Sequence, residues 1–479
     1  MLTLADVIEA LTNIQPPHAD IVITEAAVDS RQVIPGGLFV ALPGENVDGH
    51  DFVEDAFQRG ASFALIQHDV SGNHKTIHLT LGKFPTLPSG VDFSFPLQQD
   101  MPTCLLVENT LKALQQIARF WRQKLDLGVV GITGSVGKST TKEVIFDVLS
   151  QHYRTLKSPG NMNNEIGLPL TILRLGVGYQ RAVLEMGFYV PGEIALLCEI
   201  ARPRIGVVTN IGTVHAERAG SKEAIFRGKS ELIQALPGDG VAILDLDDPW
   251  VVKMAELTRA RIVFYGLNPE ADLWADHVES LGLEGIRFRL HYHHETFYMH
   301  IPMIGQHSVQ TALRAAAVGL VDNLTWQEII DGLHHGQTQL RLSAVRSETG
   351  ALLLDDTYNA SPESMLAALN LLADLDGHRV AVLGDMLELG PYERQGHEIV
   401  GVRASEVAEK LVTIGALGHL IAAAARWAGM LSENISEFET VDEAIPFLQK
   451  SLTEKDVALV KGSHGMHLER IVAALEVPS

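Results

Sequence analysis

Cysteine is scarce in this chain of 479 residues, which has only Cys104 and Cys198. Two cysteines cannot form a disulfide framework, so a reducing compartment is expected. A basic stretch followed by an apolar core, the pattern of a signal peptide, is lacking in residues 1–20. No apolar run approaches the length of a membrane span. We therefore expect a cytoplasmic protein with no membrane span.

Basic residues are also few, because 37 Lys and Arg stand against 59 Asp and Glu, for a formal net charge of −22. Nucleic-acid backbones select basic surfaces, so this balance argues against a nucleic-acid partner. A small nucleotide site is still compatible with it, since such a site needs only local charge. The composition, 46% hydrophobic and 20% charged, is that of an ordinary globular protein. The length predicts two to four domains.

Residues 1–108 are expected to form an N-terminal domain of mixed α/β structure. Short apolar runs, such as Ile21–Ile23 and Leu38–Ala41, alternate there with turn-forming sequences. The stretch Gly82–Pro102 is rich in Pro, Ser and Gln and has no helical period, which predicts a long loop. A helix over Asn109–Leu125 is predicted to follow it.

Residues 109–338 are expected to form a central domain around a parallel sheet. Apolar runs alternate there with helical patterns, which is typical of βαβ units buried on both faces. Near the end, Ile286–Tyr292 and Thr296–Ile301 alternate with period two and predict an antiparallel ribbon, followed by a helix over Val309–Val321. The predicted parallel strands are Gly128–Thr133, Ala182–Leu184, Ile205–Thr209, Val241–Leu244 and Ile262–Tyr265.

Residues 339–479 are expected to form a smaller, Rossmann-like α/β domain, because the alternation of apolar runs and helical patterns resumes there. The sequence therefore predicts an α/β protein of three domains. The predicted strands of the third domain are Ala351–Leu354, Val380–Leu383, Leu411–Ile414 and Val457–Val460.

A glycine-rich loop lies between the predicted strand Gly128–Thr133 and a predicted helix over Lys138–Gln151. Glycines let backbone N–H groups converge on phosphate oxygens, and a helix N-terminus adds positive potential. Lys138 would reach the β- and γ-phosphates, and the Ser139 hydroxyl would ligate Mg²⁺. The usual pattern has glycine where this chain has Ile132, so a glycine-rich turn with an incidental lysine is the alternative; we favour an ATP site. The predicted ATP-binding residues of this phosphate loop are Gly134, Ser135, Val136, Gly137, Lys138, Ser139 and Thr140.

Two polar side chains follow neighbouring predicted strands. Glu185 comes after Ala182–Leu184, and His215 lies in the loop after Ile205–Thr209. Ligands bind at this edge of open α/β sheets, so the carboxylate and the imidazole are candidate ligands of a second Mg²⁺. A surface or structural role is the alternative for His215. The local sequence around Lys229 predicts only a solvated helix charge.

Together these stretches resemble the Mur ligases, over almost the whole chain. Asp29–Arg31 and Pro35–Leu42 resemble the UDP-sugar-binding domain of that family. The stretches Asp355–Met365 and Val382–Gly390 resemble signatures of its dipeptide-adding members, of which the loop Gly160–Pro169 is also typical. The Asp-Asn-Pro-Arg motif of the diaminopimelate-adding members does not occur in this sequence.

The resemblance implies an ATP-dependent carboxylate–amine ligase of peptidoglycan precursor synthesis, and hence of cell-wall biogenesis. Such an enzyme adds D-alanyl-D-alanine to UDP-N-acetylmuramoyl-tripeptide through an acyl phosphate, with ATP and two Mg²⁺ ions. We expect a monomer. Whether the tripeptide ends in diaminopimelate or lysine stays open. The alternatives are a third-residue Mur ligase, a folylpolyglutamate-synthase-like enzyme and, in a different class, a phosphate-loop ATPase that acts as a switch.

The resemblance also implies roles for single residues. Lys229 matches a lysine that CO₂ carbamylates and that then ligates Mg²⁺ together with Glu185 and His215. Ser139 matches the ligand of the first Mg²⁺, and Lys138, Lys229 and His215 are the expected catalytic residues. The expected further contacts to ATP are Arg341 and Asp356, and those to the substrates are Ser30, Asn164, Tyr358 and Asn359.

A few positions depart from the family pattern. Ser308 and Thr311 stand where asparagines are usual, and the second of these asparagines commonly meets the adenine, so recognition of the base stays open. His464 stands where an arginine is usual, and its role is open too. The predicted ribbon carries three histidines that we expect to be exposed strand residues rather than a metal site: His291, His293 and His294.

Overall fold

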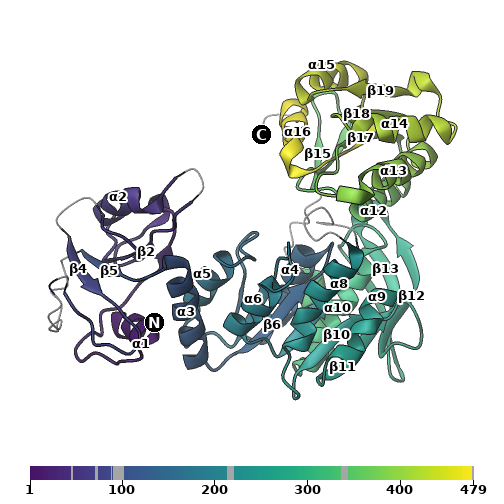
Figure 1. The fold of residues 1–479 in the computed structure, drawn as a ribbon. Coiled ribbons are helices and arrows are strands. Elements are labelled where there is room, and N and C mark those ends of the chain that lie inside the picture. Colours follow the sequence, from purple (N-terminus) through teal and green to yellow (C-terminus); the bar gives the residue numbers. More distant parts are fainter. Residues whose placement is uncertain are drawn as a thin grey trace. The chain divides into compact units, whose positions relative to one another are not determined.

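The computed structural model describes residues 1–44, 47–70, 74–87, 89, 102–212, 221–335 and 343–476. The chain divides into two compact units whose segments alternate along the sequence. Unit 1 comprises Met1–Gly131, Tyr153–Gly187 and Glu193–Arg204, and unit 2 comprises Ile132–His152, Phe188–Gly192 and Ile205–Ser479. Three sheets, of five, nine and six strands, confirm the predicted α/β class (Figure 1).

The first sheet lies in unit 1, and every pairing between its strands is parallel. Its buried core gathers apolar side chains of the strands and of α2, such as Phe39, Ala56 and Ile66. In order across the sheet, the strands are β1 (Ala26–Ala27), β2 (Leu38–Val40), β3 (Phe63–Ile66), β5 (Thr103–Leu106) and β4 (Lys75–His78), with helices α1 (Leu4–Thr12) and α2 (Val53–Gln58).

The remainder of unit 1 is built on α3 (Thr110–Lys124), which corresponds to the helix predicted over Asn109–Leu125. Arg122 on this helix is buried, and its guanidinium donates to the carbonyls of Ala201, Leu125 and Leu127 at 2.8–2.9 Å. A buried cation that satisfies three carbonyls fixes how the chain leaves α3. The helices packed on α3 are α1, α5 (Gly167–Leu173) and α6 (Glu193–Ala201).

The nine-stranded sheet has the order β14-β13-β12-β11-β10-β9-β6-β8-β7. Its strands β9 to β12 pair in parallel, and β12 to β14 form an antiparallel ribbon. The strand order changes direction at β6, and such switch points are where open α/β sheets bind ligands. The strands are β6 (Gly128–Thr133), β7 (Thr155–Lys157), β8 (Arg181–Glu185), β9 (Ile205–Val208), β10 (Val241–Asp245), β11 (Arg261–Gly266), β12 (Leu273–Ser280), β13 (Ile286–Tyr292) and β14 (Glu295–Ile301).

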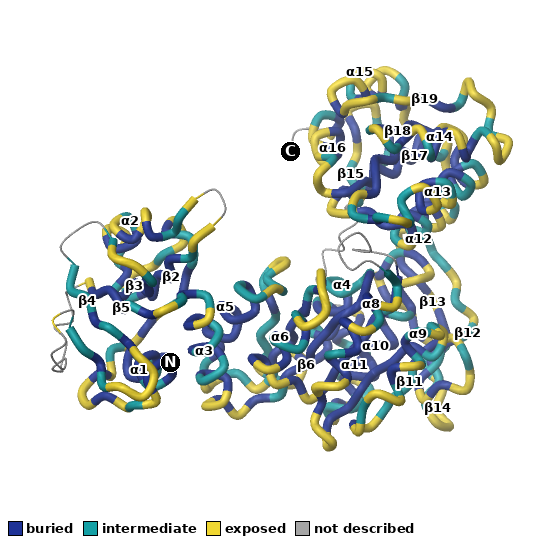
Figure 2. Tube along the Cα trace, in the orientation of Figure 1, coloured by how far each residue is buried: buried dark blue, intermediate teal, exposed yellow. Residues whose placement is uncertain are grey.

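Helices of unit 2 cover its part of this sheet, and their inner faces are buried (Figure 2). The helix after the phosphate loop, α4, packs against α10 and α11. At Gly332 on α11 an added Cβ would lie 2.5 Å from the Cα of Val148 on α4, so glycine permits this close approach. The helices are α4 (Lys138–Leu149), α8 (Lys222–Gln234), α9 (Pro249–Val252), α10 (Ser308–Val321) and α11 (Trp326–His335).

The third sheet, also in unit 2, has the order β15-β16-β20-β17-β18-β19. All its pairings are parallel except that of β15 with β16, and apolar clusters lie on both faces. The strands are β15 (Ser343–Arg346), β16 (Leu352–Asp356), β17 (His378–Gly384), β18 (Lys410–Ile414), β19 (Ile435–Phe438) and β20 (Asp456–Lys461), and the helices are α12 (Pro362–Ala373), α13 (Glu393–Val407), α14 (Gly418–Trp427), α15 (Val441–Ser451) and α16 (Glu469–Leu475).

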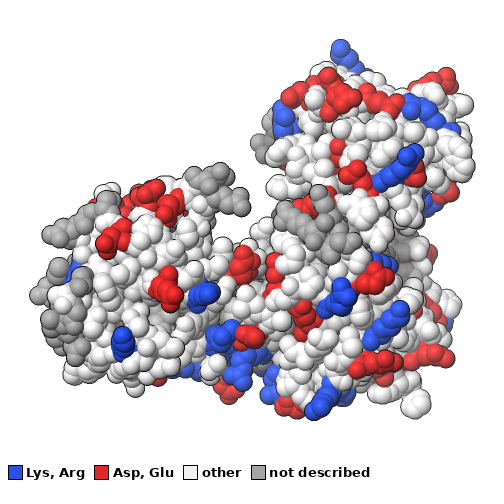
Figure 3. Space-filling model, in the orientation of Figure 1, with Lys and Arg blue, Asp and Glu red and all other residues white. Residues whose placement is uncertain are grey.

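Two surface properties complete the description. Among the described residues, no helix combines the length and the apolar character needed to cross a membrane. On the face drawn in Figure 3, lysine and arginine side chains lie scattered among aspartates and glutamates.

Candidate active site

The phosphate loop has the shape that the sequence predicts, between the end of β6 and the start of α4. Gly134 has φ +147°, and a Cβ built there would lie 1.8 Å from Oγ1 of Thr209. Gly137 has φ +83° and is the N-cap residue of α4. L-residues with side chains rarely adopt these backbone angles, so both glycines are required for the loop.

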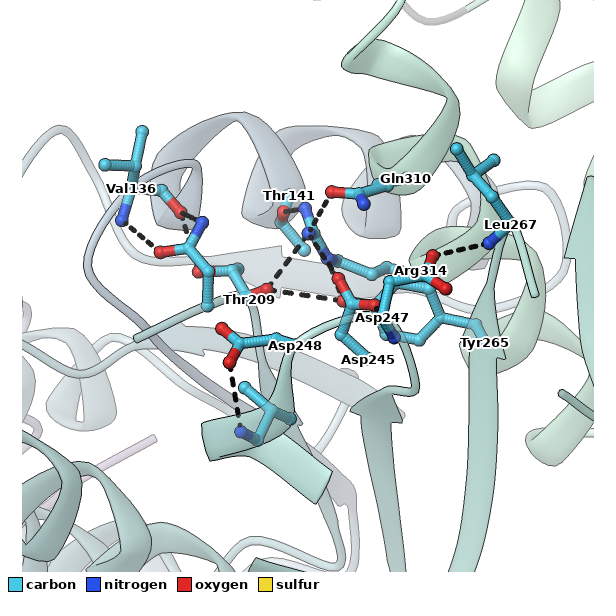
Figure 4. A network of polar contacts seen from close by, with 12 residues as sticks. Val136, Thr141, Thr209, Asp245, Asp247, Asp248, Tyr265, Leu267, Gln310 and Arg314 are labelled. Carbon is cyan, nitrogen blue, oxygen red and sulfur yellow. Dashed lines mark hydrogen bonds and ion pairs between the residues drawn. The ribbon is translucent and has the colours of Figure 1, made fainter. Parts of the chain in front are cut away.

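The loop is fastened to the two residues that follow β9, Thr209 and Asn210. Figure 4 shows Val136 of the loop beside Thr209. The Val136 N–H donates to Oδ1 of Asn210 at 3.0 Å, and the Val136 carbonyl accepts from the Thr209 hydroxyl at 2.6 Å. The Ser135 N–H donates to the Asn210 carbonyl at 3.0 Å, while Oγ of Ser135 accepts from the Gly212 N–H at 2.9 Å. Ser135 and Val136 therefore fix the loop to β9 through these groups.

Two lysine side chains converge on the loop. Lys138, at the start of α4, donates to the Gly134 carbonyl at 2.9 Å and to the Ser135 carbonyl at 3.4 Å. Lys229, on α8, donates to the same Gly134 oxygen at 2.9 Å. Lys229 is only 1% exposed, and its ammonium lies 5.1 Å from the ring centroid of Phe188. The expectation of a solvated helix charge at Lys229 is wrong, because the residue faces the loop.

Glu185 ends β8 and is 2% exposed. Its Oε1 accepts from Nδ2 of Asn163 at 2.9 Å, and its backbone N–H donates to Oγ of Ser158 at 3.2 Å. The sequence analysis selected Asn164 from this loop, yet Oδ1 of Asn164 accepts from the N–H of Gly167 at 2.8 Å, at the start of α5. Asn163 is the asparagine that orients the carboxylate, and the asparagine-rich loop was the only sign of it in the sequence.

Five further predicted residues lie in α4, in the N-terminal sheet domain or outside the described part of the chain. His215 and Arg341 lie outside the described residues. Ser139 and Thr140 are half-buried in the first turn of α4. Ser30 is buried in the N-terminal sheet domain, and its hydrogen bond to Asp55 is the largest cause that lowers the pKa of that exposed carboxylate.

The predicted residues of the third sheet meet one another at the carboxyl ends of β16 and β20. Asp356 forms an ion pair of 2.7 Å with the buried Lys461, whose ammonium also donates to the Asn359 carbonyl at 2.9 Å. Tyr358 is exposed, and its ring stacks on His464 with centroids 6.2 Å apart. This pairing of Tyr358 with His464 is a contact that the sequence analysis did not anticipate.

A cavity of about 500 Å³ adjoins the phosphate loop, because Asn210 both lines it and holds Val136. Ser308 and Thr311 are almost fully buried, and Ser308 donates back to the Ile304 carbonyl at 2.7 Å, whereas Gln310 lies on the cavity wall. The lining residues are Asn210, Ile211, Lys222, Asp245, Asp247, Asp248, Pro249, Trp250 and Gln310.

The carboxylates of this cavity differ in their surroundings. Those of Asp247 and Asp248 accept backbone N–H groups, such as that of Leu267 at 2.6 Å and that of Ile211 at 2.9 Å. Asp245 is 3% exposed, and burial raises the pKa of its carboxyl to about 6, although nearby Arg314 opposes the shift. Asp247 and Asp248 thus hold the backbone around the cavity, whereas Asp245 is buried beside Arg314.

The residues of the phosphate loop fit a nucleotide triphosphate and a hard cation. The loop ends at Gly137, the N-cap residue of α4, and a helix N-terminus attracts anions. Lys138 and Lys229 add positive charge at the same place. The Ser139 hydroxyl, in the first turn of α4, is an oxygen ligand of the type that Mg²⁺ prefers.

A second group of potential metal ligands, Asp48, His50 and His68, lies in unit 1 with ligand atoms within 4.8 Å of one another. The Gln67 N–H donates to Nε2 of His50, so Nδ1 of a neutral His50 carries the proton and donates to Asp48 at 2.6 Å. Both ring nitrogens of His50 are therefore engaged. The three side chains form a hydrogen-bonded triad. The pKa of Asp48 is lowered to about 2, chiefly by the backbone N–H of His50 and next by its ring N–H.

Three family models match the chain. They are the Mur ligase middle domain over residues 132–319, the Mur ligase glutamate ligase domain over residues 340–464, and the Mur ligase family catalytic domain over residues 22–81. The UDP-N-acetylmuramoyl-tripeptide–D-alanyl-D-alanine ligase of Bacillus subtilis (strain 168) is 36% identical over 464 residues, which cover 96% of this chain and 94% of that protein.

Solved structures of MurF proteins are similar to this chain over nearly its whole length. A crystal structure of MurF from Acinetobacter baumannii superposes with a TM-score of 0.83 at 29% identity, covering 98% of this chain and 97% of that one. The MurF ligase of Thermotoga maritima, solved in complex with ADP, has a TM-score of 0.78 at 27% identity and covers 95% of this chain and 97% of its own.

Proposed function

The chain belongs to the Mur ligase family, and from that premise we propose how its described residues divide the work of one reaction. The protein is an ATP-dependent ligase that joins D-alanyl-D-alanine to UDP-N-acetylmuramoyl-tripeptide in peptidoglycan synthesis. The observation that carries this function is full-length similarity to the dipeptide-adding ligases, together with a phosphate loop on which Lys138 and Lys229 converge.

The three predicted segments take separate tasks in this proposal. Residues 1–108 hold the UDP end of the substrate, with Ser30 among the contacts. Residues 109–338 bind ATP and carry out the phosphoryl transfer. Residues 339–479 contribute Arg341 and Asp356 to the nucleotide site. The three family models, one in each segment, support this division.

The first chemical step is attack of the tripeptide carboxylate on the γ-phosphate of ATP, which gives an acyl phosphate and ADP. Both reactants are anions, so positive charge must stabilise their approach and the transition state. In this proposal the Lys138 ammonium, which donates to the Gly134 carbonyl at 2.9 Å in the structure, contacts the β- and γ-phosphates of bound ATP. The backbone N–H groups at the start of α4 bind the same phosphates.

The second step is attack of the neutral amine of D-alanyl-D-alanine on the acyl carbon, with release of phosphate. The amine competes with water, so the acyl phosphate must be shielded from solvent. We propose that Tyr358 and Asn359, exposed at the end of β16, contact the substrates at this stage, and that Asn164 does so from the loop before α5. The Asp356–Lys461 ion pair, at 2.7 Å, would hold the Tyr358–Asn359 segment in place.

Two Mg²⁺ ions are part of the proposal, one at Ser139 and one at Glu185, His215 and carbamylated Lys229. Mg²⁺ would neutralise phosphate charge and orient the carboxylate for attack. Carbamylation joins the neutral Lys229 amine to CO₂ with loss of a proton and replaces a cation by an oxygen ligand. Lys229 is only 1% exposed, and this burial supports carbamylation, since burial in general disfavours a charged amine. The hydrogen bond from Asn163, which orients the Glu185 carboxylate, supports a metal site at Glu185.

The cavity beside the loop is proposed to receive the nucleoside half of ATP. It adjoins the phosphates through Asn210, and Gln310 supplies an amide on its wall. An amide can exchange hydrogen bonds with the edge of a purine base, as the asparagine usual at position 311 would. Gln310 is therefore the candidate for the base contact that Ser308 and Thr311 do not offer.

The decisive experiment is release of phosphate from ATP with the substrates added singly and together. A ligase needs both UDP-N-acetylmuramoyl-tripeptide and D-alanyl-D-alanine, whereas a switch ATPase hydrolyses ATP without them. Substituting UDP-N-acetylmuramoyl-dipeptide and diaminopimelate or lysine tests the third-residue alternative, and folate plus glutamate tests the folylpolyglutamate-synthase alternative. Tripeptides ending in diaminopimelate and in lysine then define the preferred substrate.

Light scattering after size exclusion tests the proposed monomer, and cell fractionation tests the proposed cytoplasmic location.

A further inference from the structure

Arg314 is a buried cation of α10 that the proposed reaction does not use. It is 3% exposed, and its guanidinium forms bonds in several directions (Figure 4). Nε donates to the Tyr265 hydroxyl at 2.5 Å, and Nη2 donates to the Thr209 carbonyl at 3.1 Å. A guanidinium offers five donors in one plane, so Arg314 can connect groups from several elements at once.

The charge of Arg314 is balanced inside the protein by Asp245, the last residue of β10. Nη2 of Arg314 lies 3.9 Å from Oδ2 of Asp245, and both side chains are about 4% exposed. Burying such a pair seldom stabilises a fold more than apolar residues of similar size would. Stability alone is therefore a weak reason for this pair, and a role in fixing one arrangement of the neighbouring groups accounts for it better.

The groups that Arg314 holds are those that fasten the phosphate loop. Its acceptor Thr209 places its own hydroxyl 2.6 Å from the Val136 carbonyl and lies against Gly134. On the other side, Nη1 of Arg314 lies 3.5 Å from Oγ1 of Thr141, in the helix that the loop begins. The guanidinium thus contacts the residue behind the loop and the first turn after it.

We propose that Arg314 is a positioning residue for ATP, which holds Thr209 against the phosphate loop so that the loop keeps its phosphate-binding shape. This inference rests on the proposed function only in that the loop binds ATP. An uncharged residue would remove all of these connections and also the 3.4 Å hydrogen bond from Nη2 to Oε1 of Gln310, and a lysine would keep the charge near Asp245 but could not reach all of the acceptors. The hydrogen bond to the Tyr265 hydroxyl and the ion pair with Asp245 hold the guanidinium itself in place.

Loss of Arg314 is expected to weaken binding of ATP and of its product ADP, and not binding of the other two substrates. A loosened loop should bind ATP and ADP less well, because its N–H groups no longer converge before the ligand arrives. Binding of the UDP-linked tripeptide and of D-alanyl-D-alanine does not depend on this loop. We expect a rise in the KM for ATP and in the dissociation constant of ADP of roughly tenfold, as for the loss of a hydrogen bond from a charged donor.

The test compares Arg314→Met and Arg314→Lys with Arg122→Met in the full-length protein. Arg122 is a matched control, since it is also buried but donates to carbonyls of residues that precede β6 or end α6. Steady-state assays give kcat and the KM of each substrate, calorimetry gives ADP binding, and thermal melting gives stability. We expect both Arg314 variants to weaken ATP and ADP alone, Arg314→Lys less severely, and Arg122→Met to lower only the melting temperature.

Unchanged KM for ATP and unchanged ADP binding in Arg314→Lys and Arg314→Met would overturn the inference. Equal weakening of all three substrates, or of ATP binding in Arg122→Met, would overturn it too, because both results indicate general loss of structure. If Arg314→Met does not fold, Arg314→Lys decides by the same two readouts. A wild-type protein that needs no substrate for ATP hydrolysis would instead contradict the proposed function and leave the loop measurements valid.

Discussion

Lys138 and Lys229 donate to one and the same acceptor, the carbonyl oxygen of Gly134, each at 2.9 Å. One residue begins α4 and the other lies in the middle of α8, so the fold brings two cations from distant parts of the sequence to a single backbone atom. Like charges this close repel. The proposed carbamylation of Lys229 would remove this repulsion and leave Lys138 as the cation that meets the phosphates, so the two lysines can be distinguished by mutation.

Lys138→Ala should lower turnover by at least about a hundredfold, the size of effect seen when a group that stabilises a charged transition state is removed. The fold should persist, because the side chain is only half-buried at a helix start. Product formation measures the first effect and thermal melting the second. Activity close to that of the wild type would remove Lys138 from the reaction.

Lys229→Ala should be nearly inactive, and bicarbonate or a short carboxylic acid should partly restore it by supplying the missing oxygen ligand. The exposed Arg227, on the same helix, provides the control Arg227→Ala, which should keep its activity and show no response to added acid. Rates are measured at several acid concentrations. Full activity in Lys229→Ala without any addition would contradict the carbamylation proposal.

Asp245 should make stability depend on pH in a predictable direction. Burial raises its pKa in the folded protein to about 6, above the ordinary value of 3.8, so the folded state holds the proton over a range where the unfolded state has lost it. Stability from this group is therefore greatest below pH 4 and falls as the pH rises to 6. Because the pKa differs by about two units between the folded and the unfolded state, the free energy of unfolding should fall by about 3 kcal/mol over this range.

Asp245→Asn cannot titrate, so denaturant unfolding of this variant and of the wild type should diverge with pH. Between pH 4 and pH 7 the wild type should lose free energy of unfolding relative to the variant, while all other carboxylates cancel in the comparison. A constant difference across this range would show that Asp245 does not carry the shift.

Gln310→Ala should raise the KM for ATP and narrow the preference for ATP over GTP. Gln310 lines the cavity, and its Oε1 accepts from Nη2 of Arg314 at 3.4 Å, which leaves the amide nitrogen to meet a base. Gln327→Ala, on the exposed face of α11, is the control for the same chemical change. Kinetics with ATP and GTP give the ratio. An unchanged ratio would exclude Gln310 from base recognition.

The strands predicted from the sequence include several that are buried on both faces and the half-buried ribbon strands β13 and β14, whose side chains alternate with period two. β6, β10, β17 and β20 are nearly continuous apolar runs, and their predicted bounds agree with the structure to within two residues. β12 was missed, because only one of its faces is buried and it carries Asp276, His277 and Glu279 together with an irregularity in its pairing. The short strands β7, β15 and β19 were missed as well, since each lies at or near a sheet edge and offers too few apolar residues.

The site divides in the same way. The locations of Glu185 and Lys138 could be predicted, because Glu185 ends an apolar run and Lys138 follows a glycine-rich turn between a strand and a helix, and their roles stay predictions. The burial of Lys229 was implied only by the family resemblance, since no local pattern on α8 distinguishes it. Asn163, Thr209 and Arg314 act through contacts between residues far apart in the sequence, and these depend on tertiary packing that periodicity does not contain.

The alternation of the two units along the chain has a consequence for biosynthesis. The polypeptide passes between the units at Gly131, His152, Gly187, Gly192 and Arg204, so the last piece of unit 1 leaves the ribosome only after two pieces of unit 2. Unit 1 cannot be complete before Arg204 has emerged, and a fragment that stops at Gly131 lacks two of its three segments. Cleavage of the polypeptide at any one position cannot separate unit 1 from unit 2. Such a chain must postpone closing its first unit during translation, and a truncated product would expose unfinished apolar surface to chaperones and proteases.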